Sequence, residues 1–195
     1  MAENNKRAII VGIPGVGKTT LITRAADMLN QARKTTVVIF GTVMFEEAKK
    51  MGLKNRDEMR RMSIEDQRRL QDLAAQRITE MKDDIVMIDT HLFINTDEGY
   101  YPGLPMRLLS IMKPTNIVMV AADPSEIAGR RKSDQTRQRD IASAENIQKE
   151  LDISRVMVAS CSILTGAPFA IIMNNDGQMG AAAANIAKIL IGDGS

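Results

Sequence analysis

Eight consecutive residues near the start of the chain have the types and spacing of a phosphate-binding loop. They satisfy G-x-x-x-x-G-K-[ST] between an apolar run and a helical pattern. Glycines let the backbone fold so that its N–H groups point at phosphate oxygens. We expect Lys18 to reach the β- and γ-phosphates and the Thr19 hydroxyl to ligate Mg²⁺. The pattern predicts a nucleoside triphosphate site made by Gly12, Ile13, Pro14, Gly15, Val16, Gly17, Lys18, Thr19 and Thr20.

An acidic residue at the end of a short apolar segment is the second candidate for the metal. Val86-Met87-Ile88 runs directly into Asp89. A carboxylate at the end of a buried strand can orient Mg²⁺ directly or through water. Such patterns are common alone, but next to a phosphate-binding loop this one predicts that Thr19 and Asp89 share the ion.

Five basic residues gather in a short stretch that has few apolar side chains. Arg130, Arg131, Lys132, Arg137 and Arg139 lie there with the acids of positions 134 and 140. Phosphoryl transfer is catalysed by positive charge aimed at the transferring group, and guanidinium groups grip phosphates with two hydrogen bonds. We expect a short lid over about 130–142 that excludes water when closed. A solvated basic loop is the alternative.

Alternating strand and helix patterns are expected to position these residues. Strands are expected over 7–11, 36–40, 85–88, 117–121 and 169–173, and helices over 18–31, 42–51, 63–82, 124–131, 144–164 and 179–191. The strand over 36–40 is apolar after Thr36, which predicts burial on both faces. Ser63 is expected to cap a helix with Asp66, and Gly52 to end another. The alternation predicts an α/β fold with a mostly parallel sheet.

Composition limits the remaining possibilities. The 195 residues fit one domain with a sizeable core. A formal net charge of +2 gives no general attraction to nucleic acid or to an anionic membrane. The single cysteine, Cys161, supplies neither an internal disulfide nor a metal site. No segment is typical of a targeting signal or a membrane span. We expect a cytoplasmic protein without zinc.

Several motifs, taken in order, resemble the archaeal adenylate kinases. Besides the phosphate-binding loop they are 40–44 (FGTVM), 56–60 (RDEMR), 88–91 (IDTH), 102–105 (PGLP) and 136–140 (TRQRD). They extend over nearly the whole chain. The N-K-x-D element with which GTPases bind guanine does not occur; the 174–177 segment (NNDG) lacks its lysine.

The resemblance implies transfer of a phosphoryl group from Mg·ATP to AMP, giving two ADP. It implies a three-layer fold of the P-loop NTPases with a five-stranded parallel sheet and a helical AMP-binding region over about 42–82, in a homotrimer. Thr42 matches the AMP region, and Arg60 is the candidate for the AMP phosphate. Arg130, Arg137 and Arg139 match catalytic arginines, and Arg155 a further phosphate clamp. The 174–177 segment matches the loop near the adenine of ATP.

Two departures from the family pattern concern the AMP site. In bacterial adenylate kinases an arginine on the first helix of this region binds the AMP phosphate, and here Glu46 stands at the comparable position. Their Gly-Phe-Pro-Arg element becomes 103–107 (GLPMR), which shifts Arg107 by one residue. The lid is also too short for the zinc-bearing form.

Three alternatives stay open from the residues alone. The acceptor could be another nucleoside monophosphate or an alcohol, or the chain could be an ATP-dependent switch associated with RNA. His91, the only histidine, is expected to pack or to orient a neighbour, because the AMP phosphate is already anionic and needs no strong base. The basic 54–69 segment also carries acids at helical spacing and no aromatic residues, so we expect an exposed helix and no bound nucleic acid.

Overall fold

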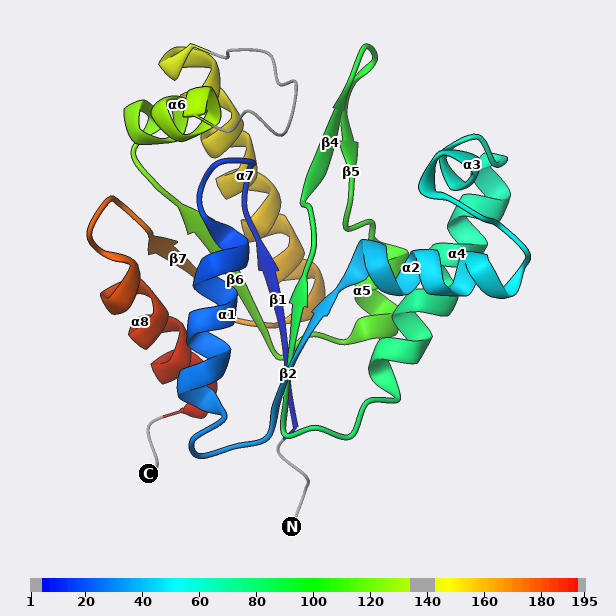
Figure 1. The fold of residues 1–195 in the computed structure, drawn as a ribbon, viewed down its shortest axis with the longest axis horizontal. Helices are drawn as coiled ribbons and strands as arrows, with labels where there is room; N and C mark the ends of the chain where they lie inside the picture. Colours follow the sequence, from blue (N-terminus) through cyan, green and yellow to red (C-terminus); the bar gives the residue numbers. More distant parts are fainter. Residues whose placement is uncertain (1–4, 134–142, 193–195) are drawn as a thin grey trace.

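A five-stranded parallel sheet forms the centre of the computed structural model, which describes residues 5–133 and 143–192 (Figure 1). The strands are β1 (Lys6–Val11), β2 (Thr35–Ile39), β3 (Ile85–Asp89), β6 (Asn116–Ala121) and β7 (Phe169–Met173). Their order is β2-β3-β1-β6-β7, and all four neighbouring pairs are parallel. The sheet that the family resemblance implied is confirmed.

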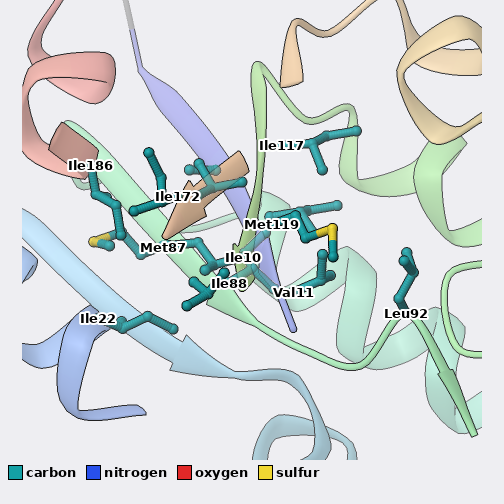
Figure 2. Close-up of a cluster of buried hydrophobic side chains, with 14 of the residues drawn as sticks. Ile10, Val11, Ile22, Met87, Ile88, Leu92, Ile117, Met119, Ile172 and Ile186 are labelled. Carbon is teal, nitrogen blue, oxygen red and sulfur yellow. The ribbon is translucent and has the colours of Figure 1, made fainter. Parts of the chain in front are cut away.

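The three central strands are apolar because helices cover both faces of the sheet. Every residue of β3 and β6 is buried, as are Ala8 to Val11 of β1. Figure 2 shows side chains of one face meeting those of α1 and α8, for example Ile10 and Met87 beside Ile22 and Ile186. This core fixes the carboxyl ends of β1, β3 and β6 at one edge.

Helices α1 (Lys18–Leu29) and α8 (Met179–Ile191) pack together on one face of the sheet. On the other face lie α5 (Met106–Met112) and α7 (Ala144–Thr165), and α7 contacts β6, β7 and the short helix α6 (Pro124–Ser133). These layers agree with the expected three-layer fold. No helix in the described ranges is long and apolar enough to cross a membrane.

Three helices between β2 and β3 form the expected helical insert. They are α2 (Phe40–Lys50), α3 (Arg56–Arg60) and α4 (Ile64–Thr79). Gly52 follows α2 with a φ of +92°, and the Ser63 hydroxyl accepts a hydrogen bond from the Asp66 N–H at the start of α4. Both expected helix boundaries are therefore confirmed.

The sequence did not predict the two-stranded antiparallel hairpin of β4 (Phe93–Thr96) and β5 (Gly99–Pro102), which projects beyond the carboxyl edge of the sheet (Figure 1). Phe93 and Tyr100 pack edge to face with their ring centroids 4.9 Å apart. Gly103 lies so close to His91 that a Cβ there would sit 2.3 Å from the His91 carbonyl oxygen. This contact allows only glycine where the hairpin returns to the sheet.

The expected burial of the second strand on both faces is wrong. β2 lies at the edge of the sheet, and Val37 and Ile39, which point to the same face, are 38% and 48% exposed. Val38, which points to the opposite face, is buried. An apolar run alone does not distinguish an edge strand from a central one, because that depends on the order of the strands.

Candidate active site

The predicted phosphate-binding loop connects β1 to α1 at the carboxyl edge of the sheet. Gly12 packs against β6, where a Cβ would lie 2.7 Å from the Val120 carbonyl oxygen. Gly15 and Gly17 have φ of +91° and +76°, which favour glycine. Gly17 is the N-cap of α1 and makes no side-chain cap, so the first amides of the helix are available to an anion.

Lys18 and Asp89 form an ion pair at the mouth of this loop. Asp89 ends β3 and lies opposite Ile10 in the register with β1, so the two strands bring loop and carboxylate together. The side chains of Lys18 and Asp89 are 10% and 9% exposed. Burial lowers the pKa of Lys18 to about 8, and the Asp89 carboxylate acts against that shift. Thr19 and Thr20 are exposed on the first turn of α1.

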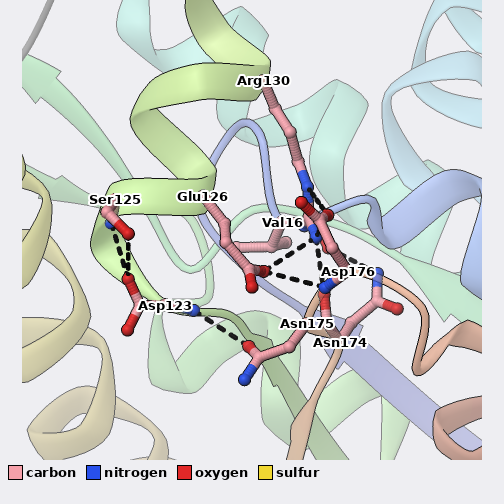
Figure 3. Close-up of polar contacts among 8 residues, drawn as sticks. All are labelled: Val16, Asp123, Ser125, Glu126, Arg130, Asn174, Asn175 and Asp176. Carbon is pink, nitrogen blue, oxygen red and sulfur yellow. Dashed lines mark hydrogen bonds and ion pairs between the residues drawn. The ribbon is translucent and has the colours of Figure 1, made fainter.

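The first arginine of the pair on α6 contacts the loop after β7. The Arg130 guanidinium is paired with Asp176, donates to Glu126 Oε2 at 3.1 Å and donates to the Asn174 carbonyl at 3.0 Å (Figure 3). The structure therefore does not direct it at the phosphate-binding loop. Predicted residues Arg137 and Arg139 lie outside the described residues.

The second arginine contacts the phosphate-binding loop itself. Arg131 Nε donates to the Pro14 carbonyl at 2.9 Å, and Arg131 Nη2 is paired with Glu150 of α7 at 2.7 Å. Its side chain is only 8% exposed. Arg155, predicted as a further phosphate clamp, is paired with Asp152 one turn earlier on α7.

The residues predicted for the AMP site lie on different helices of the insert. Thr42, in the first turn of α2, accepts a hydrogen bond of 3.2 Å from Arg56 Nη2. Arg56 also stacks over the Phe45 ring, 5.7 Å from its centroid. Arg60 is paired with Asp57 on the exposed surface of α3.

Arg107 joins two helices in this structure. Its guanidinium is paired with Asp72, and Arg107 Nη2 donates to Gln71 Oε1 at 2.9 Å, so it connects α5 to α4. Glu46, the other departure from the family pattern, is paired with Arg77 of α4 at 2.6 Å.

Comparison with known proteins assigns the family. A family model described as an AAA domain matches residues 11–148, which include the phosphate-binding loop and Asp89. An adenylate kinase of Methanocaldococcus jannaschii is 42% identical, over 95% of this chain and 98% of that protein. An adenylate kinase of Thermoplasma acidophilum is 41% identical, over 96% and 100%. The chain belongs to the archaeal adenylate kinases. Another member of this family, from Pyrococcus furiosus, is 45% identical over 86% of each chain.

Two solved structures of shikimate kinases have a similar fold. Shikimate kinase from Acinetobacter baumannii, solved in complex with shikimate, has a TM-score of 0.61 at 16% identity, covering 97% of this chain and 94% of that one. Shikimate kinase from Bacteroides thetaiotaomicron has a TM-score of 0.58 at 14% identity, with coverage of 95% and 98%. At these identities the likeness concerns the fold alone.

Sequence reasoning about this chain missed two contacts of the site. Arg131 contacts the phosphate-binding loop, although Arg130 was the member of this adjacent pair predicted to be catalytic. Arg56 contacts Thr42, although Arg60 was predicted for AMP. In both cases the sequence offered several nearby arginines and no signal to rank them. Among the described residues no three side chains of His, Cys, Asp and Glu are grouped to hold a metal ion.

Proposed function

We propose that this chain catalyses reversible phosphoryl transfer from Mg·ATP to AMP, giving two ADP. The observation that carries the proposal is a phosphate-binding loop with Lys18 and Asp89 at its mouth, in a chain 41–45% identical to adenylate kinases over most of its length. Transfer between two phosphates needs positioning and positive charge more than a base. The paired Lys18 and the amides of α1 offer that charge.

The triphosphate of ATP is proposed to lie along residues 12–20, with Lys18 on the β- and γ-phosphates. Lys18 would then leave Asp89, whose carboxylate, with the Thr19 hydroxyl, offers the hard oxygen ligands that suit Mg²⁺. The bound ion would neutralise charge on the β- and γ-phosphates. Thr19 follows the loop after β1 and Asp89 ends β3, so both lie at the carboxyl edge of the sheet, which supports this assignment. The absence of zinc stays an expectation.

AMP is proposed to bind on the helical insert of residues 42–82, near Thr42 and with Arg60 on its phosphate. The Arg56–Thr42 contact makes Arg56 a second candidate for that phosphate. The two are separated by measuring KM for AMP in Arg60→Ala and Arg56→Ala. We expect substitution of the arginine that binds the AMP phosphate to raise KM for AMP roughly tenfold or more, because a hydrogen bond to a charged group is lost. KM for ATP should stay unchanged in both variants, and an unchanged KM for AMP in both would contradict this AMP site.

The lid is proposed over residues 130–142, with Arg130, Arg137 and Arg139 on the transferring phosphoryl group and Arg155 as a further clamp. Arg130 would exchange Asp176 and Glu126 for phosphate oxygens, because a triphosphate offers a guanidinium more negative charge than two partly solvated carboxylates. The 174–177 loop, which Arg130 contacts, is proposed to lie beside the adenine.

The proposal is tested by measuring ADP formation from Mg·ATP with AMP, CMP, UMP, GMP or no acceptor. We expect rapid ADP formation with AMP. Preference for another monophosphate would make the chain a kinase for that nucleotide. Slow ATP hydrolysis that no monophosphate accelerates would contradict the proposal and favour an ATP-dependent switch, which salt-dependent RNA binding would then support.

The oligomer is proposed to be a homotrimer in the cytoplasm, as the family resemblance implies. Exposed apolar side chains on the neighbouring elements α7 and β7 support self-association. Ile163 is 83% exposed, and the alternate residues of β7 point to one face of an edge strand. The set comprises Val156, Ile163, Leu164, Phe169, Ile171 and Met173. We name it the α7–β7 patch.

A further inference from the structure

Two side chains from outside the phosphate-binding loop each donate a hydrogen bond to a carbonyl of that loop. Asn174 Nδ2, at the end of β7, donates to the Val16 carbonyl at 2.8 Å (Figure 3). Arg131 Nε, on α6, donates to the Pro14 carbonyl at 2.9 Å. The two carbonyls stand two residues apart in the loop, and each belongs to a peptide unit whose N–H is contributed by a glycine.

The planar trans peptide bond links each held carbonyl to the next amide. Within one peptide unit the C=O and N–H point in opposite directions. When Asn174 holds the Val16 carbonyl, the Gly17 N–H points away from Asn174; when Arg131 holds the Pro14 carbonyl, the Gly15 N–H points away from Arg131. We propose that Asn174 and Arg131 are positioning residues that aim the Gly17 and Gly15 amides at the phosphates of ATP.

Asn174 is held rigidly for this task. It is 1% exposed, and its own N–H donates to the Ala121 carbonyl at the end of β6 at 2.7 Å. Its amide packs against Gly17, where a Cβ would lie 2.6 Å from Asn174 Nδ2. Its Oδ1 is buried and has no hydrogen-bond partner among the described residues, so within them the side-chain amide is bonded only through Nδ2, to the loop. The loop is thereby attached to the central sheet at a second point.

Arg131 is held by a different element. Its pairing with Glu150 connects α6 to α7, and its Cγ would lie 3.1 Å from a Cβ added at Gly15. A guanidinium that is buried, paired with a carboxylate and bonded to a carbonyl is suited to hold the loop in place. Of the two adjacent arginines, Arg131 therefore acts on the protein backbone, which leaves Arg130 for the nucleotide. The inference rests on the proposed function, since it assumes that ATP phosphates occupy this loop.

The test for Asn174 compares Asn174→Ala with Asn116→Ala. Asn116 is another buried asparagine, at the opposite end of β6, where its Oδ1 accepts a hydrogen bond from the Thr115 hydroxyl. We expect both variants to lose stability, but only Asn174→Ala to raise KM for ATP, by roughly 10- to 100-fold, the range that follows from loss of a hydrogen bond to a charged group. KM for AMP should stay within about twofold.

The isosteric Asn174→Asp variant keeps the shape of the side chain but replaces its donor with a negative charge. A carboxylate keeps the packing against Gly17 but cannot donate to the Val16 carbonyl. We expect it to weaken ATP binding at least as much as alanine does. If the aspartate variant does not fold, calorimetric titration of Asn174→Ala with ATP decides instead, because that measurement does not need turnover.

Arg131→Ala is compared with Lys149→Ala, which removes an exposed ion pair with Glu145 on α7 next to Glu150. We expect a rise in KM for ATP of roughly tenfold or more in the arginine variant and no change in the lysine variant. The inference would be overturned if Asn174→Ala bound ATP as well as Asn116→Ala does and Arg131→Ala bound ATP as well as Lys149→Ala does. Failure of the wild-type chain to form ADP from ATP and AMP would instead overturn the proposed function.

Discussion

Lys18 and Asp89 are the two charged side chains on which the proposed chemistry depends, and in the structure each is the partner of the other. Both side chains are about nine-tenths buried, so water solvates neither charge as fully as it would at the surface. A triphosphate with Mg²⁺ offers Lys18 an anion and Asp89 a cation at the same place. Binding of Mg·ATP can therefore replace one ion pair by two without leaving a buried charge unpaired.

Lys18→Ala should lower kcat by roughly 10² to 10³ or more, because it removes a positive charge placed where negative charge develops in transfer. The fold should persist, since Lys18 lies at the first turn of α1 and the buried residues of that helix lie further along it. Steady-state kinetics and far-UV circular dichroism measure both effects. Full activity in a folded variant would contradict the role given to Lys18.

The pH dependence of ATP use should report the pKa of Lys18, which burial lowers to about 8. Lys18 is charged below that pH and loses its charge as the pH rises through it. We therefore expect kcat/KM for ATP to fall above about pH 8, roughly tenfold per pH unit. At saturating ATP the phosphates hold the proton on Lys18, so kcat should stay flat over the same range. The prediction would be contradicted if kcat/KM for ATP were the same one pH unit above that pKa as one pH unit below it.

Elements marked by a clear apolar pattern were predictable from the sequence, whereas short elements without one were not. The strand over 169–173 and the helix over 179–191 agree with β7 and α8 to the residue, because their apolar spacing is regular. α3 has five residues, and β4 and β5 have four each that are mostly exposed, so no apolar pattern marks them. Their formation depends on what they pack against.

The site was predictable only where it is contiguous in sequence. Residues 12–19 form a local motif, and the structure places them in a loop with the expected glycine conformations. Asn174 contacts Val16 across 158 positions, and Arg131 contacts Pro14 across 117, so the order of the strands decides these contacts. No spacing within one segment distinguishes Arg131 from Arg130.

The helical insert is held together by a buried carboxylate between α2 and α4. Glu47 is buried and accepts hydrogen bonds from Lys50 at 2.7 Å and Arg77 at 3.1 Å. The hydrogen bond from Lys50 is the larger cause of a lowered pKa of Glu47, and the hydrogen bond from Arg77 acts in the same direction. We expect Glu47→Gln to lower the free energy of unfolding by about 1–2 kcal/mol at neutral pH, measured by urea denaturation.

The matched control for this substitution is Glu46→Gln, which removes a half-exposed partner of the same Arg77 and should cost less than about 1 kcal/mol. Because the folded-state pKa of Glu47 is lowered, its contribution is present above its usual pKa and is lost as pH falls. The difference in stability between wild type and Glu47→Gln should therefore shrink in acid. An equal cost in both variants at neutral pH would contradict this assignment.

The whole molecule combines a buried central sheet with attached parts that carry residues proposed to bind the substrates. The insert leaves the carboxyl end of β2 and returns to the amino end of β3, whereas α6 follows the carboxyl end of β6 (Figure 1). The start of the insert and α6 therefore lie at the edge that carries the phosphate-binding loop. Ligands of open α/β sheets bind at this edge.

At this scale the α7–β7 patch predicts how the chain associates. Ile163→Glu places a charge at the most exposed apolar side chain of the patch and should shift the assembly toward monomers. Light scattering coupled to size-exclusion chromatography measures the mass of both proteins at one concentration. Ile64→Glu, on the exposed surface of α4, is the control and should leave the mass unchanged. Trimers of the Ile163→Glu variant, or a monomeric wild type, would contradict the prediction.

Transfer of a labelled phosphoryl group is the measurement that tests the proposed function most directly. ATP labelled at its γ-phosphate is mixed with Mg²⁺, AMP and the purified chain, and the products are separated. We predict that the label appears in ADP, that two ADP form for each AMP consumed, and that Lys18→Ala abolishes most of this transfer. Label released as inorganic phosphate, with AMP unchanged, would contradict the assignment of this chain as an ATP:AMP phosphotransferase.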